Sequence, residues 1–237
     1  MAARFLRRYT DLPSLLYLLS ERKLSLLNPD NWDDSNDSYL LNLYRTWMGL
    51  ASVLAVCFTQ VDETYHHWRV FAPGPSGICI RFKRAELLGQ LDDQSGIRMG
   101  AVSYLKLIAM RRRTPPFDDL PFLKRQAFAN EREFRVIYES KRGHKEKLDI
   151  PIPLACIDKI TLSPWLHPAL FPNARSMLKS ITGVRPIPIV HSTLVSSTQW
   201  KSLAEKVAKR GHNSRQVLSS QSSDSPTHST STLSAGA

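Results

Sequence analysis

Short apolar segments typical of strands and others typical of helices are mixed along the chain. This mixture constrains the fold more than any other feature of the sequence. Residues 52–59 and 77–82 are dense in β-branched and other apolar side chains, which favours strands. Behind Asp11 and Pro13, which are typical of a helix start, leucines recur at helical spacing. Because strands and helices do not follow a strict strand–helix–strand order, we expect an α+β fold with a mainly antiparallel or mixed central sheet flanked by helices.

The same patterns predict the remaining elements. Further strands are expected at residues 5–9, 23–27, 99–107, 133–139, 157–162 and 187–195. Further helices are expected at residues 40–50, 63–72, 120–130, 168–181 and 198–209. Residues 30–37 are rich in aspartate and asparagine, and we expect them to form a polar loop outside the core.

The length of 237 residues suits one domain followed by a tail. We expect residues 1–210 to form a single domain. From Gly211 onward the composition changes to a run rich in serine and threonine. Such a segment buries too little apolar surface to offset the entropy of ordering it, so residues 211–237 are expected to be a disordered tail.

The cysteine content and the first residues predict a cytoplasmic protein. Three cysteines lie far apart in apolar segments, which is typical of reduced thiols in the cytosol. The first residues carry arginines and lack the apolar run of a secretory leader. The apolar stretch at residues 40–58 contains polar residues, so we expect a buried helix and strand there and no membrane association.

Positive charge dominates the chain. It has 32 Lys and Arg against 21 Asp and Glu, a formal net charge of +11, which suits an anionic partner such as a nucleotide or a nucleic acid. The clusters at residues 111–113 and 124–125 are candidates for attracting phosphates. No glycine-rich phosphate-binding loop is present, and neither the cysteines nor the adjacent His66 and His67 have the spacing of metal ligands, so we predict no metal site.

Arg8 is the first candidate for the functional site, with Tyr9 beside it. Both stand at the end of the first expected strand and just ahead of a helix start. A guanidinium matches the geometry of phosphate oxygens, and the free N–H groups of a helix start attract anions. The alternative is a basic strand end that lies in solvent.

Two glutamates provide the second candidate. Glu131 and Glu133 are two residues apart, so in an extended segment both carboxylates project from the same face. Such a pair lets one carboxylate orient a sugar hydroxyl while the other attracts a proton from an incoming nucleophile. Glutamates with this spacing also occur on ordinary surfaces, and that alternative stays open.

A hydroxyl and a group of aromatic residues complete the set. Thr59 ends a dense apolar strand, and an aromatic segment that includes Trp68 and Phe71 follows it. Aromatic residues at helical spacing most simply predict a helix packed on the sheet.

Several short motifs resemble a family in their order and spacing. They are Arg-Arg-Tyr-Thr at residues 7–10, Trp-Asp-Asp-Ser-Asn at 32–36, Cys-Phe-Thr at 57–59, Gly-Ile-Cys-Ile at 77–80, Phe-Leu-Lys-Arg-Gln-Ala-Phe at 122–128 and Glu-Arg-Glu-Phe-Arg at 131–135. Together they resemble the mostly bacterial domain of unknown function family numbered 2971, from about residue 7 to about residue 194. That family implies no activity.

An arginine that closes the first strand, a hydroxyl on a middle strand and Glu-x-Glu before a late strand also resemble the Arg-Ser-Glu ADP-ribosyltransferases. This resemblance implies that NAD is the substrate, that Arg8 holds its phosphate with Tyr9 nearby, and that Thr59, in place of the usual serine, positions the nicotinamide ribose. It further implies that Glu133 is the catalytic carboxylate and Glu131 assists the acceptor. The expected stacking surface for nicotinamide is Trp68 or Phe71.

The functional hypothesis is therefore an NAD-dependent ADP-ribosyltransferase-like protein, with a bacterial defence or toxin effector as one setting. A second hypothesis is a basic protein that binds or cleaves nucleic acid, with Trp32, Trp68 and Phe71 stacking on bases. In that case Asp33, Asp34, Asp37 and Asp62 would hold a cation such as Mg²⁺. A third is a regulatory protein without enzymatic activity.

Overall fold

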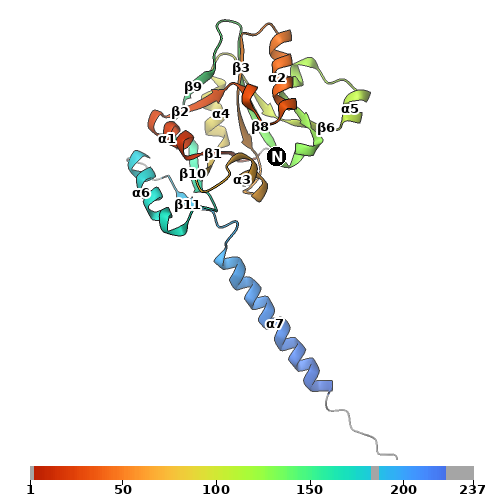
Figure 1. Ribbon diagram of the computed structural model, residues 1–237, viewed down its shortest axis with the longest axis vertical. Coiled ribbons are helices and arrows are strands. Elements are labelled where there is room, and N and C mark those ends of the chain that lie inside the picture. Colours follow the sequence, from red (N-terminus) through yellow and green to blue (C-terminus); the bar gives the residue numbers. More distant parts are fainter. Residues whose placement is uncertain (1–2, 183–186, 223–237) are drawn as a thin grey trace, which may run out of the picture. The chain divides into compact units, whose positions relative to one another are not determined.

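The structure, a computed structural model, describes residues 3–182 and 187–222. The chain divides into two compact units, of which the first spans Met1–Val195 and the second begins at Ser196. The first unit contains the sheets and the candidate site. The described part of the second unit consists mainly of one helix, α7 (Figure 1).

The elements of the first unit have the following bounds. The strands are β1 (Phe5–Asp11), β2 (Lys23–Leu27), β3 (Ser52–Thr59), β4 (Gly77–Lys83), β5 (Ile97–Ala101), β6 (Ser103–Leu105), β7 (Leu123–Arg125), β8 (Glu133–Ser140), β9 (Lys147–Pro151), β10 (Ile157–Leu162) and β11 (Ile189–His191). The α-helices are α1 (Leu12–Glu21), α2 (Ser35–Trp47), α3 (Tyr65–Phe71), α4 (Arg84–Asp92), α5 (Leu107–Arg112) and α6 (Phe171–Thr182). Short 3₁₀ helices are η1 (Pro29–Asn31), η2 (Phe117–Phe122), η3 (Gln126–Glu131), η4 (Leu154–Cys156) and η5 (Pro168–Leu170).

A large mixed sheet forms the centre of the first unit. Its main strand order is β11-β10-β4-β1-β3-β2-β9, and β8 pairs with β3 and with β5. The pairings are antiparallel except that of β10 with β11, which is parallel. The prediction of an α+β fold with a mainly antiparallel or mixed sheet flanked by helices is confirmed.

Strand β3 is the junction of this sheet. One of its edges pairs with β8 along the whole strand, from Ser52 opposite Ser140 to Thr59 opposite Glu133. The other edge is shared, because β1 pairs with it at Thr59 and β2 pairs with it at Ala55. The sheet therefore opens along one side of β3, between these two points of contact.

Alternation along β3 and β8 separates apolar from polar chemistry. Leu54, Val56 and Phe58 face the main core, together with Phe134 and Val136 of β8. The residues between them belong to the opposite face, which α2 covers with its own smaller apolar cluster. Thr59 and Glu133, which pair with each other at one end of these strands, therefore lie on the face that carries α2.

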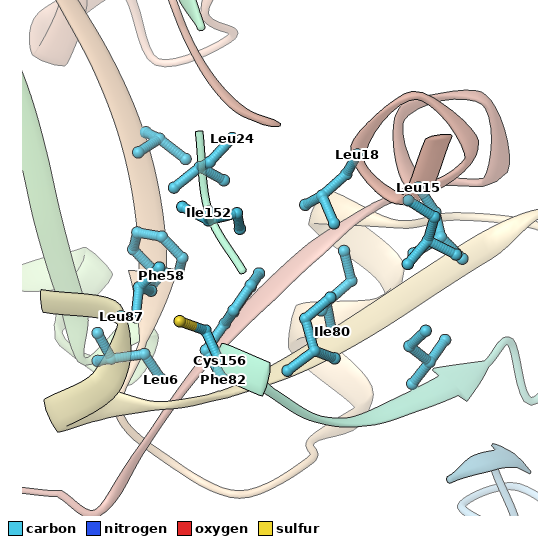
Figure 2. Packing of buried hydrophobic residues seen from close by; sticks show 14 of the residues in the cluster. Leu6, Leu15, Leu18, Leu24, Phe58, Ile80, Phe82, Leu87, Ile152 and Cys156 are labelled. Atoms are coloured by element: carbon cyan, nitrogen blue, oxygen red, sulfur yellow. The ribbon is translucent and has the colours of Figure 1, made fainter. Parts of the chain in front are cut away.

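The main core lies on the other side of the sheet. Helices α1, α4 and α6 contribute leucines to it, among them Leu15, Leu87 and Leu178. Figure 2 shows Leu15 and Leu18 of α1 packed toward Ile80 and Phe82 of the sheet. This burial supplies the apolar stabilisation that holds β1 and β3 in place.

Three predictions about elements differ from the structure. Residues 120–130 form no single helix. The segment passes through the end of η2, then β7, which pairs with β6, and then η3. The acidic stretch was also misjudged, since α2 begins at Ser35 and the side chain of Asp37 in its first turn is buried. The strand expected at residues 99–107 is split into β5 and β6.

Helix α7 (Thr198–Ser222) continues beyond Lys209, where the composition predicted that it would end. Residues 223–237, the rest of the predicted tail, lie outside the described residues. Among the helices in the described part of the chain, none combines the length and the apolar character that crossing a membrane requires.

Candidate active site

A cavity of about 670 Å³ opens where β1 and β3 separate. Its walls include Arg8 and Tyr9 from β1, the strand from Ala55 to Thr59, the first turn of α2, the end of α3 and the segment that leads into β8. A volume of this size is within the usual range for sites that bind small molecules or cofactors. The cavity is therefore the natural candidate for an active site.

Strand register brings the distant candidates together. Arg7 lies opposite Thr59, and Thr59 lies opposite Glu133 on the next strand. Adjacent strands are about 4.8 Å apart, so the part of β1 around Arg7 and the start of β8 are separated by only about 10 Å. Arg8 lies within β1, which continues to Asp11, and not at the strand end that the sequence predicted. Arg8, Thr59 and Glu133 all line the one cavity.

The guanidinium of Arg8 has no hydrogen-bond or salt-bridge partner among residues 3–182 and 187–222. The residue is half-buried, and no hydrogen bond or salt bridge joins its side chain to another residue in the described part of the chain. Burial lowers the pKa of Arg8, and the nearby Cys57 and Asp11 only partly offset this effect. Its neighbour Arg7, by contrast, donates to the carbonyl of Val61 and pairs with Asp62. Arg8 therefore carries a partly desolvated charge in the wall of the cavity, and among the described residues no anion forms a hydrogen bond or salt bridge with it.

The two glutamates both reach the cavity, but not through an extended segment. Glu131 ends η3, and Arg132 between the glutamates adopts the left-handed conformation, with φ of 46°. The same Lys124 ammonium nevertheless contacts both carboxylates, at 2.7 Å from Glu131 and 3.5 Å from Glu133. The expected juxtaposition is present, and a tight turn rather than strand alternation produces it.

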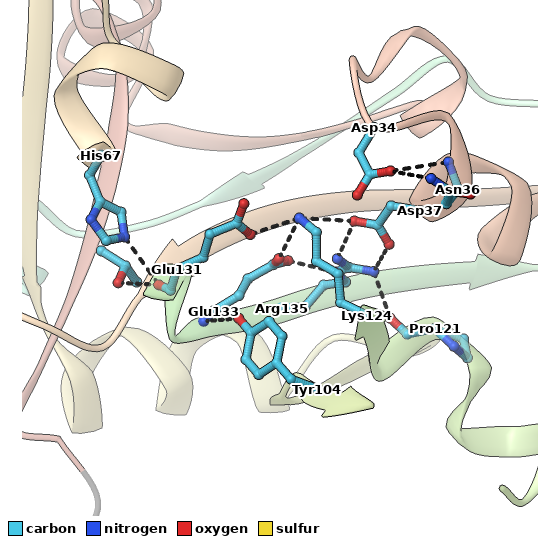
Figure 3. Close-up of polar contacts among 11 residues, drawn as sticks. Asp34, Asn36, Asp37, His67, Tyr104, Pro121, Lys124, Glu131, Glu133 and Arg135 are labelled. Atoms are coloured by element: carbon cyan, nitrogen blue, oxygen red, sulfur yellow. Dashed lines mark hydrogen bonds and ion pairs between the residues drawn. The ribbon is translucent and has the colours of Figure 1, made fainter. Parts of the chain in front are cut away.

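A buried ionic cluster surrounds the glutamates, and Figure 3 shows it. We use the name carboxylate cluster for Asp37, Lys124, Glu131, Glu133 and Arg135. Arg135 is fully buried and donates through Nε to Glu133 at 2.7 Å and through both terminal nitrogens to Asp37, at 2.8 and 2.7 Å. Lys124 also lies 3.4 Å from Asp37. Two cations thus hold three carboxylates close together.

The cluster drives the pKa values of the two glutamates apart. Burial raises the pKa of Glu133, but the charges of Arg135 and Lys124 outweigh burial and hold it below the ordinary value. Burial also raises the pKa of Glu131, and there Lys124 compensates only in part, since Glu133 and Asp37 add repulsion. Glu133 is therefore set to stay ionised, whereas Glu131 is the more basic carboxylate of the pair. Opposed shifts of this kind are typical of groups that divide an acid–base task.

Two side chains fix the backbone of Glu131. Thr59 donates its hydroxyl proton to the Glu131 carbonyl at 2.6 Å, and Nε2 of His67 lies 3.1 Å from the same oxygen. Because a carbonyl only accepts, Nε2 carries the proton, and Nδ1 accepts from the hydroxyl of Thr64 at 2.6 Å. Burial lowers the pKa of His67, which favours this neutral form. The hydroxyl of Thr59 is thus used inside the protein, and only a lone pair remains for a ligand.

The aromatic candidates have different positions. Phe71 lines the cavity and is 41% exposed, so part of its side chain is accessible there. Trp68 is fully buried and donates from Nε1 to Glu63 at 2.7 Å, so it is a core residue and its expected role in stacking is wrong. Tyr9 lines the cavity with its ring, which stacks on His67 at 5.3 Å between centroids.

Sequence reasoning assigned Arg135 and His67 no part in the site, and it considered Asp37 only as a ligand of a cation. The one signal was Arg135, a charge inside an apolar strand, which requires a buried partner. Lys124 was expected to attract phosphates from the surface, but it is buried among carboxylates.

The four aspartates that the second hypothesis assigned to Mg²⁺ do not form one metal-binding group. Asp37 is occupied by Arg135 and Lys124, Asp62 pairs with Arg7, and Asp34 caps α2 by accepting from the backbone N–H of Asn36. Cations of the protein thus already neutralise two of the four carboxylates. Within residues 3–182 and 187–222, no group of three or more His, Cys, Asp or Glu is arranged to hold a metal ion.

No family model and no curated protein matches the sequence. Solved structures that resemble the chain in fold include Thermus sp. 2.9 DarT in complex with carba-NAD⁺, with a TM-score of 0.41, 10% identity and coverage of 81% of this chain and 96% of that chain. The same protein with NAD⁺ has a TM-score of 0.40, 9% identity and coverage of 80% and 96%. With ADP-ribosylated ssDNA it has a TM-score of 0.41, 10% identity and coverage of 80% and 94%. These similarities are distant, so the chemistry of the cavity is assessed from the residues of this chain alone.

Proposed function

We propose that the cavity binds NAD and that the protein is an ADP-ribosyltransferase. The observation that carries this proposal is the unpaired guanidinium of Arg8 in the same cavity as the ionised carboxylate of Glu133. The first group fits an anionic phosphate, and the second fits a developing positive charge. NAD has both features, because it carries phosphates and because positive charge develops on its nicotinamide ribose as the bond to nicotinamide breaks.

Phosphate recognition is the role of Arg8. Its donors have no partner in the part of the chain that the structure describes. A charged hydrogen bond to a phosphate in a partly desolvated site contributes about 1.5–3 kcal/mol. Phe71 provides the exposed ring on which nicotinamide stacks, and Tyr9 forms the adjoining wall. Thr59 contributes mainly by holding Glu131, and its remaining lone pair accepts from a ribose hydroxyl.

Cleavage of the bond between ribose C1′ and the nicotinamide nitrogen leaves both electrons on nicotinamide. The ribose becomes oxocarbenium-like, and the fixed negative charge of Glu133 stabilises it without reorganisation, since Arg135 already holds the carboxylate. The acceptor then bonds to C1′, and its proton passes to Glu131, the more basic carboxylate. The products are free nicotinamide and an ADP-ribosylated acceptor.

Release of nicotinamide from NAD tests this proposal. The wild-type chain should release nicotinamide, and Glu133→Gln should lower the rate by at least about 100-fold, as expected when a principal electrostatic group of the transition state is removed. Glu86→Gln is the matched control, because Glu86 lies on α4 and pairs there with Lys83. The proposal fails if the wild-type chain neither binds nor cleaves NAD, or if Glu133→Gln cleaves it at the wild-type rate.

A nucleic acid is a second candidate partner, and α5 is the observation that favours it. This helix buries none of its residues, and it ends in the run Arg111–Arg113, all three exposed. Such a segment suits contacts with backbone phosphates. Binding to a fluorescent single-stranded oligonucleotide should weaken steeply with salt, and substituting all three arginines with glutamine should flatten the dependence by about one unit of slope per lost contact. A salt-independent affinity would exclude this role.

A further inference from the structure

Lys124 stands apart within the carboxylate cluster, because its ammonium group contacts all three carboxylates, Asp37, Glu131 and Glu133. It extends from β7, a strand of the small second sheet, and its side chain is only 8% exposed. In Figure 3 its nitrogen lies between Glu131 on one side and Asp37 on the other. Nothing in the reaction outlined above gives this lysine a contact with the reacting atoms.

Arg135 cannot replace Lys124 in this position. Its nitrogens donate to Glu133, to Asp37 and to the carbonyl of Pro121, so its donors point away from Glu131. Among the described residues, Lys124 is the only cation paired with the carboxylate of Glu131. The two glutamates therefore depend on the lysine unequally.

We propose that Lys124 is a positioning residue that holds the carboxylate of Glu131 beside that of Glu133 and keeps it free to accept a proton from the acceptor. The catalytic part of this inference rests on the proposed function. Lys124 acts through Glu131 and does not touch the substrate. Without its charge, Glu131 is a buried carboxylate next to two others and takes up a proton.

The groups that face the two glutamates come from several elements, and all contribute to their titration. They are Asp37 of α2, Cys57 of β3, His67 of α3, Tyr104 of β6, Lys124 of β7 and Arg135 of β8. Tyr104 accepts from the backbone N–H of Glu133 at 2.8 Å, and His67 contacts the backbone of Glu131. Burial raises the pKa of Glu131, the negative charges of Glu133 and Asp37 raise it further, and Lys124 lowers it.

Titration of the side-chain carboxyl carbons by NMR tests the inference without NAD. The full chain carries ¹³C-labelled glutamate, and Glu131→Gln and Glu133→Gln assign the two signals. In Lys124→Gln, the midpoint of Glu131 should rise by about 1–3 pH units, the usual effect of removing an opposite charge at this distance, and that of Glu133 should rise less because Arg135 remains. Lys124→Arg should restore most of the shift, and Lys83→Gln, which removes a surface partner of Glu86, should leave both midpoints in place.

The rate of NAD cleavage and transfer against pH gives the second measurement. In Lys124→Gln, the acid limb for transfer to an acceptor should move to higher pH by the same amount as the Glu131 midpoint, with partial recovery in Lys124→Arg. A lysine with only a structural role would lower the rate at every pH without moving that limb.

The two measurements separate the failures of the two proposals. Unchanged glutamate midpoints in Lys124→Gln would overturn the role of Lys124, even if the wild-type chain cleaves NAD. If the wild-type chain cleaves no NAD but Lys124→Gln shows the expected shift of the Glu131 midpoint, the proposed function is overturned and the control of Glu131 by Lys124 is supported. If Lys124→Gln does not fold, Lys124→Arg provides the test, because it keeps the positive charge. A Glu131 midpoint more than one pH unit away from the wild-type value in Lys124→Arg would then overturn the inference.

Discussion

Replacing Arg8 with methionine should stabilise the protein while it weakens NAD binding. Methionine keeps much of the apolar volume of the side chain and removes a charge that no hydrogen bond or salt bridge within the described residues compensates. A fully buried, unpaired ion costs several kcal/mol. Arg8 is only half-buried and faces the cavity, so we expect a gain of about 1–2 kcal/mol. In a domain of this size that gain raises Tm by roughly 2–8 °C.

The same substitution should raise the Kd for NAD by roughly 10- to 150-fold, the equivalent of a lost charged hydrogen bond of 1.5–3 kcal/mol. Thermal unfolding by circular dichroism measures the first effect and titration calorimetry with NAD measures the second. Arg135→Met is the contrasting variant, because Arg135 is fully buried and paired with Asp37 and Glu133, and its loss should cost about 3–5 kcal/mol. A fall in Tm for Arg8→Met, or an unchanged Kd, would refute the assignment of Arg8 to a ligand.

Three further predictions concern the walls of the cavity and its acids. Thr59→Val removes the hydrogen bond to the Glu131 carbonyl and should lower kcat for nicotinamide release about 10-fold, whereas Thr59→Ser should keep most of the rate; equal rates for the two variants would contradict this. Phe71→Ala should raise the Kd for NAD with little change in Tm, because Phe71 is partly exposed. Trp68→Ala should cost about 3–5 kcal/mol of stability, because Trp68 is fully buried. Similar losses of Tm in the two variants would contradict this placement of the two rings. Because folding lowers the pKa of Glu133, its contribution to stability is present above its unfolded pKa of about 4.3 and is lost as pH falls through the folded pKa. Glu131 has the opposite sign, since folding raises its pKa, and its contribution becomes unfavourable as pH rises through the unfolded pKa. Thermal unfolding of Glu133→Gln and Glu131→Gln between pH 3 and 7 checks both, and parallel curves would contradict the opposed shifts.

Local patterns predicted most elements of the fold, because an element with a buried face repeats apolar residues at the spacing of a strand or a helix. The strands β3 and β8 are dense in apolar residues, and α1 carries leucines at helical spacing, so sequence alone located them. The segment from residue 120 to 130 was mistaken for a helix because its apolar residues mimic helical spacing, whereas residues Leu123–Arg125 pair with β6 as a strand, a contact that the local sequence does not encode. The opening of the sheet beside β3 could not be predicted, since it depends on register between strands that are distant in sequence.

The candidate site was predictable only in part. Residue type singled out Arg8 and Glu133, and strand register explains why both line one cavity, although Arg8 lies in the middle of β1 and not at the strand end that the sequence predicted. Asp37 was assigned to solvent because its neighbours are acidic, but a buried aspartate is recognisable only once its partner Arg135 is placed beside it. The role of Lys124 likewise depends on distances that no local pattern encodes.

The structure of the full chain in complex with a non-hydrolysable NAD analogue is the most direct test of the central claim. The account predicts that the analogue lies in the cavity beside β3, with a phosphate within hydrogen-bond distance of the Arg8 guanidinium and the nicotinamide ribose against the carboxylate of Glu133. An analogue bound elsewhere, or bound in the cavity with Arg8 far from either phosphate, would contradict it.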